Sequence, residues 1–202
     1  MYLRPISDRD YEWIRATELA GEDGLTYRHR GLTPSPEQFA HTLWHGVVAQ
    51  YVVSSTTGQP MGTVTSYGAD FRNGWAYVAA FLLPEFRGFG WPLEGLEIFI
   101  SRVFDAFPFR RLYFDVLEPN LNQFGFDLGG IIQTIARFPS HEYVCGEYVD
   151  RIVLSIERSD WERPDRTTLA PRQGGDQLMI RSPLLGRLRA RDSMVHGTSA
   201  DC

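Results

Sequence analysis

The middle of the chain carries the clearest pattern of apolar and polar positions. Trp75 to Leu83 is a nearly continuous apolar run, and a turn containing two glycines follows it. After the turn, the apolar residues step by three, four and seven, which is the period of one helix face: Leu93, Leu96, Ile100, Val103, Phe104 and Phe107. The pattern predicts a strand, a glycine-rich turn and a surface helix laid on a sheet.

This junction has a chemical consequence. The first N–H groups of a helix have no intrahelical partner, and the positive end of the helix dipole lies beside them. The stretch from Pro84 to Pro92 therefore predicts an anion-binding site. An ordinary strand-turn-helix without a ligand is the alternative, because a lone Gly-x-Gly is a weak signal.

The N-terminal segment predicts a strand and a helix. Tyr2 to Ile6 alternates weakly and ends at Ser7. Asp10 follows three residues later, which is an acidic variant of the capping-box spacing. A buried stripe then continues to Ala20, and Gly21 ends the helix.

The next segment predicts a second helix and two strands. Residues 22–33 are rich in glycine and charge, which is typical of a loop. A helix starts at Ser35-Pro36, since proline is favoured at the first helical position. Val47 to Ser55 and Met61 to Tyr67 are strands by their β-branched and aromatic content, and they lead into Trp75 to Leu83 as an antiparallel meander.

The segment after the central helix predicts a crossover and a hairpin. Arg111 to Leu117 is a strand that should lie parallel and adjacent to Trp75–Leu83, because a helix links the two. Asn120 to Leu128 is a short, glycine-interrupted helix. Ile131 to Phe138 and Tyr148 to Ile156 alternate and flank a loop, residues 139–147, which predicts a closing hairpin.

These elements amount to an α+β fold with a mixed, mostly antiparallel sheet of about seven strands and about four helices. Dense apolar patterning ends at Trp161, so residues 1–161 are expected to form one domain. Residues 162–202 are dominated by Pro, Gly, Ser, Thr and Arg and predict a flexible, removable tail. A short helix docked at Leu184 to Arg191 is an open alternative for part of that tail.

Composition excludes several classes of function. The formal net charge is −5, so no basic field suggests nucleic acid or an acidic membrane surface as a partner. All 20 basic residues are arginine, which excludes a Schiff-base or P-loop lysine. Two cysteines, Cys145 and Cys202, make no disulfide framework. With no apolar leader segment and no 18-residue apolar run, we expect a cytoplasmic protein.

Three stretches in this order resemble the Gcn5-related N-acetyltransferase (GNAT) superfamily. PEFRGFGWPLEG looks like its acyl-CoA signature, with Arg87 first and the glycines after it. The strand before Glu118-Pro119-Asn120 is similar to the family's fifth strand and the Asn that follows it. The ending YVDRIVLSIERSDW looks like the last strand of the ribosomal-protein alanine acetyltransferase branch. Together the three resemblances span residues 1–161.

The resemblance implies a binding mode for acetyl-CoA or another acyl-CoA, with no metal. In the family, the fourth and fifth strands splay apart and the pantetheine arm bonds the fourth strand, here at the backbones of Leu82 and Leu83. Backbone amides of the loop wrap the pyrophosphate, since glycine lets the phosphate approach closely. Residues assigned to the cofactor on this basis are Leu82, Leu83, Arg87, Gly88, Phe89, Gly90, Trp91 and Asn120, with Arg87 either fixing the loop or clamping phosphate.

Two departures from the family pattern concern the donor and the general acid. Pro92 stands where the family has Gly or Ala, follows the bulky Trp91, and supplies no N–H. Asp127 stands where many members carry a Tyr that reprotonates the leaving thiolate. Water, Tyr143 or Tyr148 would then have to supply that proton.

Candidate catalytic and acceptor residues come from the strands and loops. Asp115 lies among apolar neighbours, which disfavour the ionised carboxyl group and strengthen it as a base. Its alternative is an Asp bonded to Arg or backbone within the sheet. Glu85 is the second candidate. The acceptor side is expected to include Tyr27, Arg28 and His29 from the first loop and His141 from the hairpin, with solvated loop residues as the alternative.

Three functions follow, in order of preference. The first is an N-acyltransferase that moves an acetyl or other acyl group from acyl-CoA to a primary amine of a small molecule or peptide by direct attack in a ternary complex. The second transfers a longer acyl chain, from CoA or an acyl-carrier protein, as the Trp91-Pro92 pair suggests. The third is a non-catalytic binding module that kept the fold. A homodimer through sheet edges is compatible with each.

Overall fold

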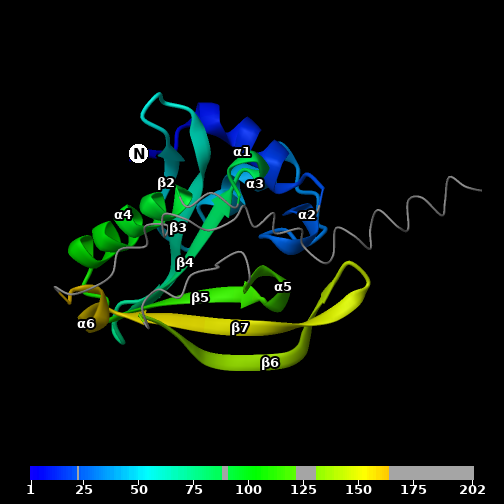
Figure 1. The fold of residues 1–202 in the computed structure, drawn as a ribbon. Coiled ribbons are helices and arrows are strands. Elements are labelled where there is room, and N and C mark those ends of the chain that lie inside the picture. The colour runs from blue at the N-terminus through cyan, green and yellow to red at the C-terminus, as the bar shows by residue number, and fades with distance from the viewer. Residues whose placement is uncertain (22, 88–90, 122–130, 164–202) are drawn as a thin grey trace, which may run out of the picture.

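The structure is a computed structural model that describes residues 1–21, 23–87, 91–121 and 131–163. It contains a seven-stranded mixed sheet in the order β1-β2-β3-β4-β5-β7-β6 (Figure 1). The strands are β1 (Tyr2–Pro5), β2 (Val47–Ser54), β3 (Pro60–Asp70), β4 (Trp75–Leu82), β5 (Arg111–Leu117), β6 (Ile132–Val144) and β7 (Glu147–Glu157). Neighbouring strands are antiparallel except β4 and β5, which are parallel. The predicted fold class is confirmed.

The described helices are mostly short. They are η1 (Asp8–Asp10), α1 (Tyr11–Glu18), α2 (Asp23–Thr26), α3 (Pro36–Leu43), η2 (Pro84–Phe86), α4 (Trp91–Ala106), α5 (Glu118–Leu121) and α6 (Arg158–Trp161). The single turn of α2 falls within the predicted loop of residues 22–33, because Gly21 with φ +51° ends the first helix and lets the chain begin a second. No helix of the described ranges is long and apolar enough to cross a membrane.

The helices cover the two faces of the sheet unequally. On one face, α4 buries Phe99, Ile100 and Val103 against a core that includes Val53 and Leu112. On the other face, α1 and α3 place Ile14, Phe39 and Leu43 against Val52 of β2. The predicted buried stripe of α4 is therefore confirmed at Leu96, Ile100, Val103 and Phe104.

The hairpin of β6 and β7 is longer than the sequence predicts. Most of residues 139–147, expected as a loop, extend the two strands to a tight turn at Cys145-Gly146, whose φ values are +51° and +90°. A bulge between Phe138 and Glu142 takes up the irregular residues. The Asp150 carboxylate stabilises this bulge by accepting the Ser140 N–H at 2.8 Å.

A well-packed residue lies near the end of the last described range. Trp161 is 4% exposed, its ring lies 6.4 Å from that of Phe104, and its indole N–H donates to Ser101 Oγ. Residues 164–202 lie outside the described ranges, so the boundary at residue 161 and the tail, with its short helix at Leu184 to Arg191, stay predictions.

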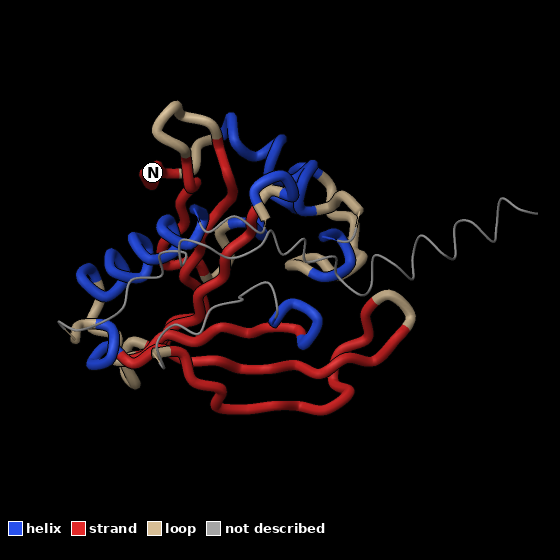
Figure 2. The backbone as a smooth tube through the Cα atoms, viewed as in Figure 1, coloured by secondary structure: helices blue, strands red, loops and turns tan. Residues whose placement is uncertain are grey.

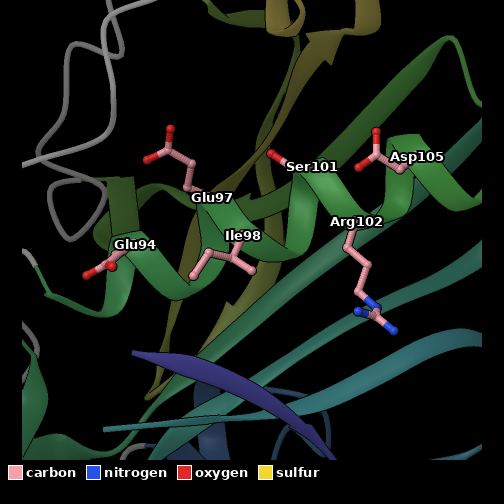
Figure 3. Close-up of a pocket in the computed structure, with 6 residues that line it drawn as sticks. All are labelled: Glu94, Glu97, Ile98, Ser101, Arg102 and Asp105. Carbon is pink, nitrogen blue, oxygen red and sulfur yellow. The ribbon is translucent and has the colours of Figure 1, made fainter. Parts of the chain in front are cut away.

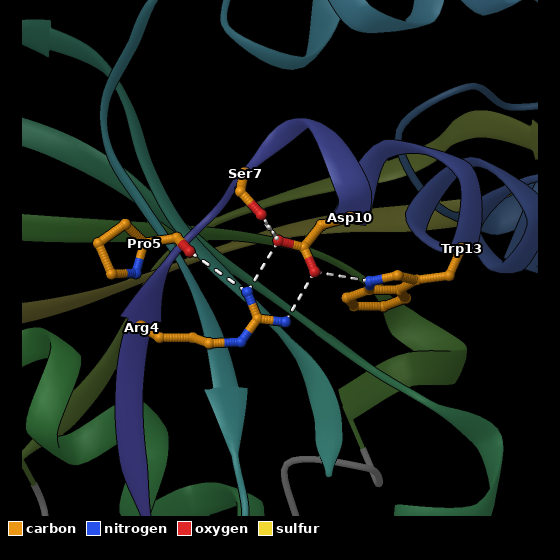
Figure 4. Close-up of polar contacts among 5 residues, drawn as sticks. All are labelled: Arg4, Pro5, Ser7, Asp10 and Trp13. Atoms are coloured by element: carbon orange, nitrogen blue, oxygen red, sulfur yellow. Dashed lines mark hydrogen bonds and ion pairs between the residues drawn. The ribbon is translucent and has the colours of Figure 1, made fainter. Parts of the chain in front are cut away.

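A polar cluster fixes the start of the first helix (Figure 4). The buried carboxylate of Asp10 accepts two hydrogen bonds from Arg4, at 2.8 and 2.7 Å, and one from the Ser7 N–H at 2.9 Å. The Trp13 indole N–H donates to the same carboxylate. This arrangement confirms the capping box predicted from Ser7 and Asp10. The bonds from Arg4 hold the pKa of Asp10 well below its usual range, against an opposing effect of burial.

We expect Asp10→Asn to lower the free energy of unfolding by about 2 kcal/mol at pH 7, because Arg4 would lose its ionic partner. A carboxyl group whose folded-state pKa is depressed stabilises the fold above its unfolded value of about 3.9 and loses that contribution as pH falls below it. Urea unfolding at pH 7 and pH 3 should therefore show a smaller difference between wild type and variant at pH 3. An unchanged difference would contradict the assignment.

Candidate active site

The strands β4 and β5 meet at one end of the sheet and separate toward the other. Their pairing consists of Trp75↔Arg111, Ala76↔Leu112 and Tyr77↔Tyr113, and it stops there. Figure 2 shows the two strands diverging from this end. Among the described strands, β4 pairs beyond Tyr77 with β3 alone, and β5 pairs beyond Tyr113 with β7 alone. The splay implied by the family resemblance is present.

The open edge of β4 is formed by alternate residues. The Leu83 N–H donates to the Met61 carbonyl of β3 at 3.0 Å. In an antiparallel ladder, alternate residues bond the same neighbour, so Phe81 and Ala79 also turn their backbone groups toward β3. The backbone groups of Ala80 and Leu82 point the other way, into the splay, where β5 is no longer paired with them.

Arg87 fixes the end of this edge. Its Nε and Nη2 donate to the Leu82 carbonyl at 3.0 and 2.9 Å, and Nη2 also donates to the Asp23 carboxylate of α2 at 2.6 Å. Of the two residues expected to bond pantetheine, Leu82 therefore offers its N–H, and Leu83 faces β3. Ala80 joins Leu82 as an open position, which the sequence alone did not identify.

The remaining predicted cofactor residues are described only in part. Gly88, Phe89 and Gly90 lie outside the described residues. Trp91 begins α4, and Asn120 lies in α5, directly after β5. Their cofactor roles, and that of Asp127, which is also outside the described residues, stay predictions.

Asp115 of β5 is half of an ion pair. Arg151 of β7 donates to both of its carboxylate oxygens, from Nε at 2.8 Å and from Nη2 at 2.6 Å. The two side chains are 21% and 30% exposed. This is the arrangement that the sequence left as the alternative to a free base. Glu85, the second candidate, lies exposed in η2.

We expect Asp115→Asn to lower kcat less than about 100-fold, because the carboxylate is engaged by Arg151 rather than free to accept a proton. Removing a true general base costs about 10²–10⁴ in rate. Steady-state kinetics with Arg151→Gln as the matched variant test this, since both changes break the same pair. A loss above 1,000-fold in Asp115→Asn alone, with Arg151→Gln near wild type, would restore Asp115 as the base.

A buried cluster holds the segment that carries Tyr27 and Arg28. Glu18 is fully buried, and its Oε2 lies 3.7 Å from Arg28 Nε and 3.6 Å from His29 Nε2. His29 is itself buried, with its ring 5.4 Å from that of Phe39. The structure thus places His29 in the interior and leaves Tyr27 and Arg28 nearer the open side of the sheet.

Tyr27 connects this segment to β4. Its ring packs on that of Phe81 at 4.9 Å, one residue before Leu82. Burial raises the pKa of Tyr27, and the negative charge of Glu18 adds to that effect. A phenol with a raised pKa stays protonated at neutral pH and can donate a hydrogen bond. The predicted role of Tyr27 at the acceptor side stays a prediction, supported by this position.

The hairpin contributes to the same side of the molecule. His141 is 47% exposed beside the bulge and lies 3.9 Å from the Glu142 carboxylate. Glu142 forms an ion pair with Arg30, so the hairpin contacts the segment between α2 and α3. Tyr143 and Tyr148 lie exposed near the turn, past Leu117↔Arg151 where the pairing of β5 with β7 ends. Tyr143 and Tyr148 therefore lie away from the point where β4 and β5 separate.

We expect Arg30→Gln to raise KM for the acceptor about threefold without changing kcat, because an ion pair with one exposed partner contributes up to about 1 kcal/mol. Arg137→Gln is the matched control, since Arg137 of β6 pairs with Asp150 of β7 and with Glu118 of α5 instead of with Glu142. Michaelis constants for amine and donor should be measured separately for both variants. An equal change in both variants would mean that the hairpin contact does not act on the acceptor side.

One set of residues was missed by the sequence reasoning. Tyr67 of β3, Tyr77 of β4 and Tyr113 of β5 lie on the sheet face that α4 does not cover, with centroid distances of 5.6 Å for Tyr67–Tyr77 and for Tyr77–Tyr113. Burial raises the pKa of Tyr67, and the charge of Asp115 adds to it. We call this side, with Asp115 and Arg151, the tyrosine face. Period-two alternation along the three strands was the signal that could have found it.

A groove elsewhere on the molecule is separate from this site. It runs along the outer surface of α4 and is lined by Glu94, Glu97, Ile98, Ser101, Arg102 and Asp105 (Figure 3). The opposite surface of α4 packs on the sheet, so the groove and the tyrosine face lie on different sides of the protein. Within the described ranges, no group of His, Cys, Asp or Glu is arranged to hold a metal ion.

Comparisons with known proteins show which solved structures have a similar fold. No protein-family model matches the chain. No curated protein matches its sequence either. Among solved structures, the spermidine N-acetyltransferase of Vibrio cholerae with CoA and spermine matches with a TM-score of 0.71 at 14% identity, over 80% of this chain and 98% of that one.

Two further structures give the same result. A putative phosphinothricin N-acetyltransferase matches with a TM-score of 0.62 at 20% identity, over 77% of this chain and 97% of that one. The ribosomal L7/L12 α-N-protein acetyltransferase RimL, in complex with coenzyme A, matches with a TM-score of 0.64 at 17% identity, over 77% and 92% of the two chains. The chain has the fold of the Gcn5-related N-acetyltransferases.

Proposed function

We propose that this protein is an N-acyltransferase that moves an acetyl or other acyl group from acyl-CoA to a primary amine of a small molecule or peptide. The observation that carries the proposal is the splay, where the backbone groups of Ala80 and Leu82 face a gap in an otherwise continuous sheet. A backbone N–H that faces no neighbouring strand favours a ligand with an amide chain. Such a chain can accept its hydrogen bond as a strand would. The extended pantetheine arm of CoA has that chemistry.

The chain's own residues account for binding and orientation. Arg87 holds the end of β4 through the Leu82 carbonyl and ties it to α2, so the edge is rigid where the donor would bond it. The bound donor supplies an acyl thioester. The amine nitrogen forms the new C–N bond, the C–S bond breaks, and the proton that the nitrogen loses balances the one taken up by sulfur. Holding the two reactants together can supply about 7 kcal/mol or more of the barrier.

Tyrosine phenols are the proposed proton donors. Tyr77 and Tyr113 form the last pair before β4 and β5 separate, so they lie where the gap begins. Tyr67 lies beside Tyr77 with a raised pKa and is therefore a protonated phenol at neutral pH. In this proposal they take the role for which the sequence suggested water, Tyr143 or Tyr148.

A longer acyl donor, or an acyl-carrier protein, is the second candidate. Pro92 lies in the first turn of α4 and removes one N–H from the helix end that would face a pyrophosphate. A donor without the adenosine diphosphate needs fewer such contacts. Turnover with C2 to C12 acyl-CoAs and with an acylated carrier protein distinguishes the two, and a strong preference for acetyl-CoA would reject the carrier protein.

Acyl transfer itself is tested on the full chain with acetyl-CoA and a panel of primary amines. We expect release of free thiol only when an amine is present, and a product whose mass has increased by one acetyl group. Isothermal titration with acetyl-CoA accompanies the assay. If no heat of binding appears at millimolar acetyl-CoA, the function is not that of an acyl-CoA enzyme and the non-catalytic module is favoured.

A further inference from the structure

Four aromatic rings form a continuous row on the tyrosine face. Tyr67, Tyr77, Tyr113 and Trp75 contribute them, and we call this set the aromatic row. Trp75 lies 5.8 Å from both Tyr77 and Tyr113, ring centre to ring centre, and the tyrosines lie 5.6 Å from their neighbours. All four side chains are half-buried rather than buried.

The aromatic row is not part of the hydrophobic core. The residues that alternate with it on the same strands, such as Ala76, Val78 and Leu112, are buried against α4 on the opposite face. On the side of the row, α1 and α3 pack over Val52 of β2 instead. Within the described residues, four large rings are thus gathered on a sheet surface without belonging to either hydrophobic core, which favours a recognition surface.

The position of the aromatic row fits the second substrate of a transfer reaction. Tyr77 and Tyr113 are both members of the row and are the last pair before the splay. A molecule that rests on the row therefore has one end at the opening between β4 and β5. That is where the proposed function requires the reacting amine.

Three ion pairs lie around the aromatic row. Asp115 pairs with Arg151, Glu157 pairs with Arg111 beside Tyr113, and Glu18 lies against Arg28 near Tyr67. These three carboxylates thus have arginine partners, and the carboxylate of Asp70, which lies opposite Trp75, accepts hydrogen bonds from Asn73. A polyamine with several positive charges would need unpaired carboxylates, since desolvating each ammonium group is costly.

We propose that the acceptor is an amine on a short linker attached to a planar aromatic group, an arylalkylamine, which rests on the aromatic row. This inference rests on the proposed function and narrows its substrate class. Ring-on-ring contacts stabilise a bound aromatic group beyond the effect of the area that they bury. An arylalkylamine carries one amine, which can reach the splay in its neutral form. It has no second cationic group that would need a carboxylate partner.

The test compares 2-phenylethylamine, propylamine and spermidine as acceptors with acetyl-CoA. We expect kcat/KM for 2-phenylethylamine to exceed that for each of the other two at least tenfold. Tyr113→Leu should remove most of this preference, whereas Tyr143→Leu, a change in the exposed ring pair at the hairpin turn, should leave it intact. Tyr113→Phe keeps the ring and should keep the preference. It tests the aromatic acceptor even if Tyr113→Leu does not fold.

Different results would contradict the aromatic acceptor and the proposed function. If acetyl-CoA binds and spermidine is preferred, or if the preference survives in Tyr113→Leu, the aromatic acceptor is wrong while acyl transfer stands. If acetyl-CoA does not bind, the proposed function fails, and direct titration of 2-phenylethylamine into wild type, Tyr113→Leu and Tyr143→Leu still tests the row. Binding that is equal in wild type and Tyr113→Leu, or absent from wild type, would overturn it.

Discussion

Ala80→Pro is expected to abolish binding of acetyl-CoA while the protein stays folded. Proline has no N–H, and the N–H of Ala80 faces the splay rather than β3. Strands tolerate proline where the missing N–H has no ladder partner. The loss of a hydrogen bond and the bulk of the ring at the edge should weaken binding about 100-fold or more. Titration calorimetry measures the binding, and circular dichroism measures the fold.

Ala79→Pro is the matched control. Its N–H points to β3, within the pair Thr65↔Ala79, so proline there breaks the antiparallel ladder. We expect Ala79→Pro to lower thermal stability strongly, whereas Ala80→Pro should change it little. Acetyl-CoA binding at wild-type affinity in a folded Ala80→Pro protein would mean that the donor does not bond this edge.

The second large effect is expected at Gly62 of β3. A Cβ added there would lie 2.1 Å from the Phe81 carbonyl oxygen and 3.0 Å from the Leu82 Cα. Because both atoms belong to the backbone of β4, the strand itself would have to move. We expect Gly62→Ala to lower the free energy of unfolding by about 2–3 kcal/mol and to weaken acetyl-CoA binding, since the displaced strand carries the open edge.

Gly95→Ala provides the comparison. Its added Cβ would lie 2.5 Å from Val53 Cγ1, which is a side-chain atom. Alanine also gains about 1 kcal/mol over glycine inside a helix such as α4. Urea unfolding should show a smaller loss for Gly95→Ala than for Gly62→Ala. The reverse order would contradict the close approach of β3 to β4.

The antiparallel meander, the parallel crossover and the closing hairpin could be predicted from the sequence because they depend on local patterns. Apolar runs of strand length, a helix of period 3.6 and short connections leave few ways to order the sheet. The helix face at Leu96, Ile100 and Val103 and the capping box at Ser7 and Asp10 are of this kind.

Features that depend on partners distant in sequence could not be predicted in the same way. The bonds of Arg151 to Asp115 join residues 36 positions apart, and the bond of Arg87 to Asp23 spans 64. Nothing near Asp115 in the sequence identifies its partner. Residues 139–147 were expected to form a loop, whereas Asp150, ten positions from Ser140, stabilises a bulge within a strand.

The aromatic row illustrates the same limit within the candidate site. Each tyrosine was visible as an alternating strand position, and the three strands were predicted to be neighbours, but the sequence does not state their register. Only the registers Tyr67↔Tyr77 and Tyr77↔Tyr113 place the three rings side by side. The sequence therefore suggested water, Tyr143 or Tyr148 as the proton source in place of the usual Tyr, whereas the tyrosines nearest the splay belong to the strands.

A crystal structure of the full chain with coenzyme A tests the central claim most directly. We predict that the pantetheine arm lies between β4 and β5, with a hydrogen bond from the Ala80 N–H and the sulfur next to Tyr77 and Tyr113. Coenzyme A bound elsewhere, for example in the groove on α4, with the splay closed by protein, would contradict the proposed acyltransferase site.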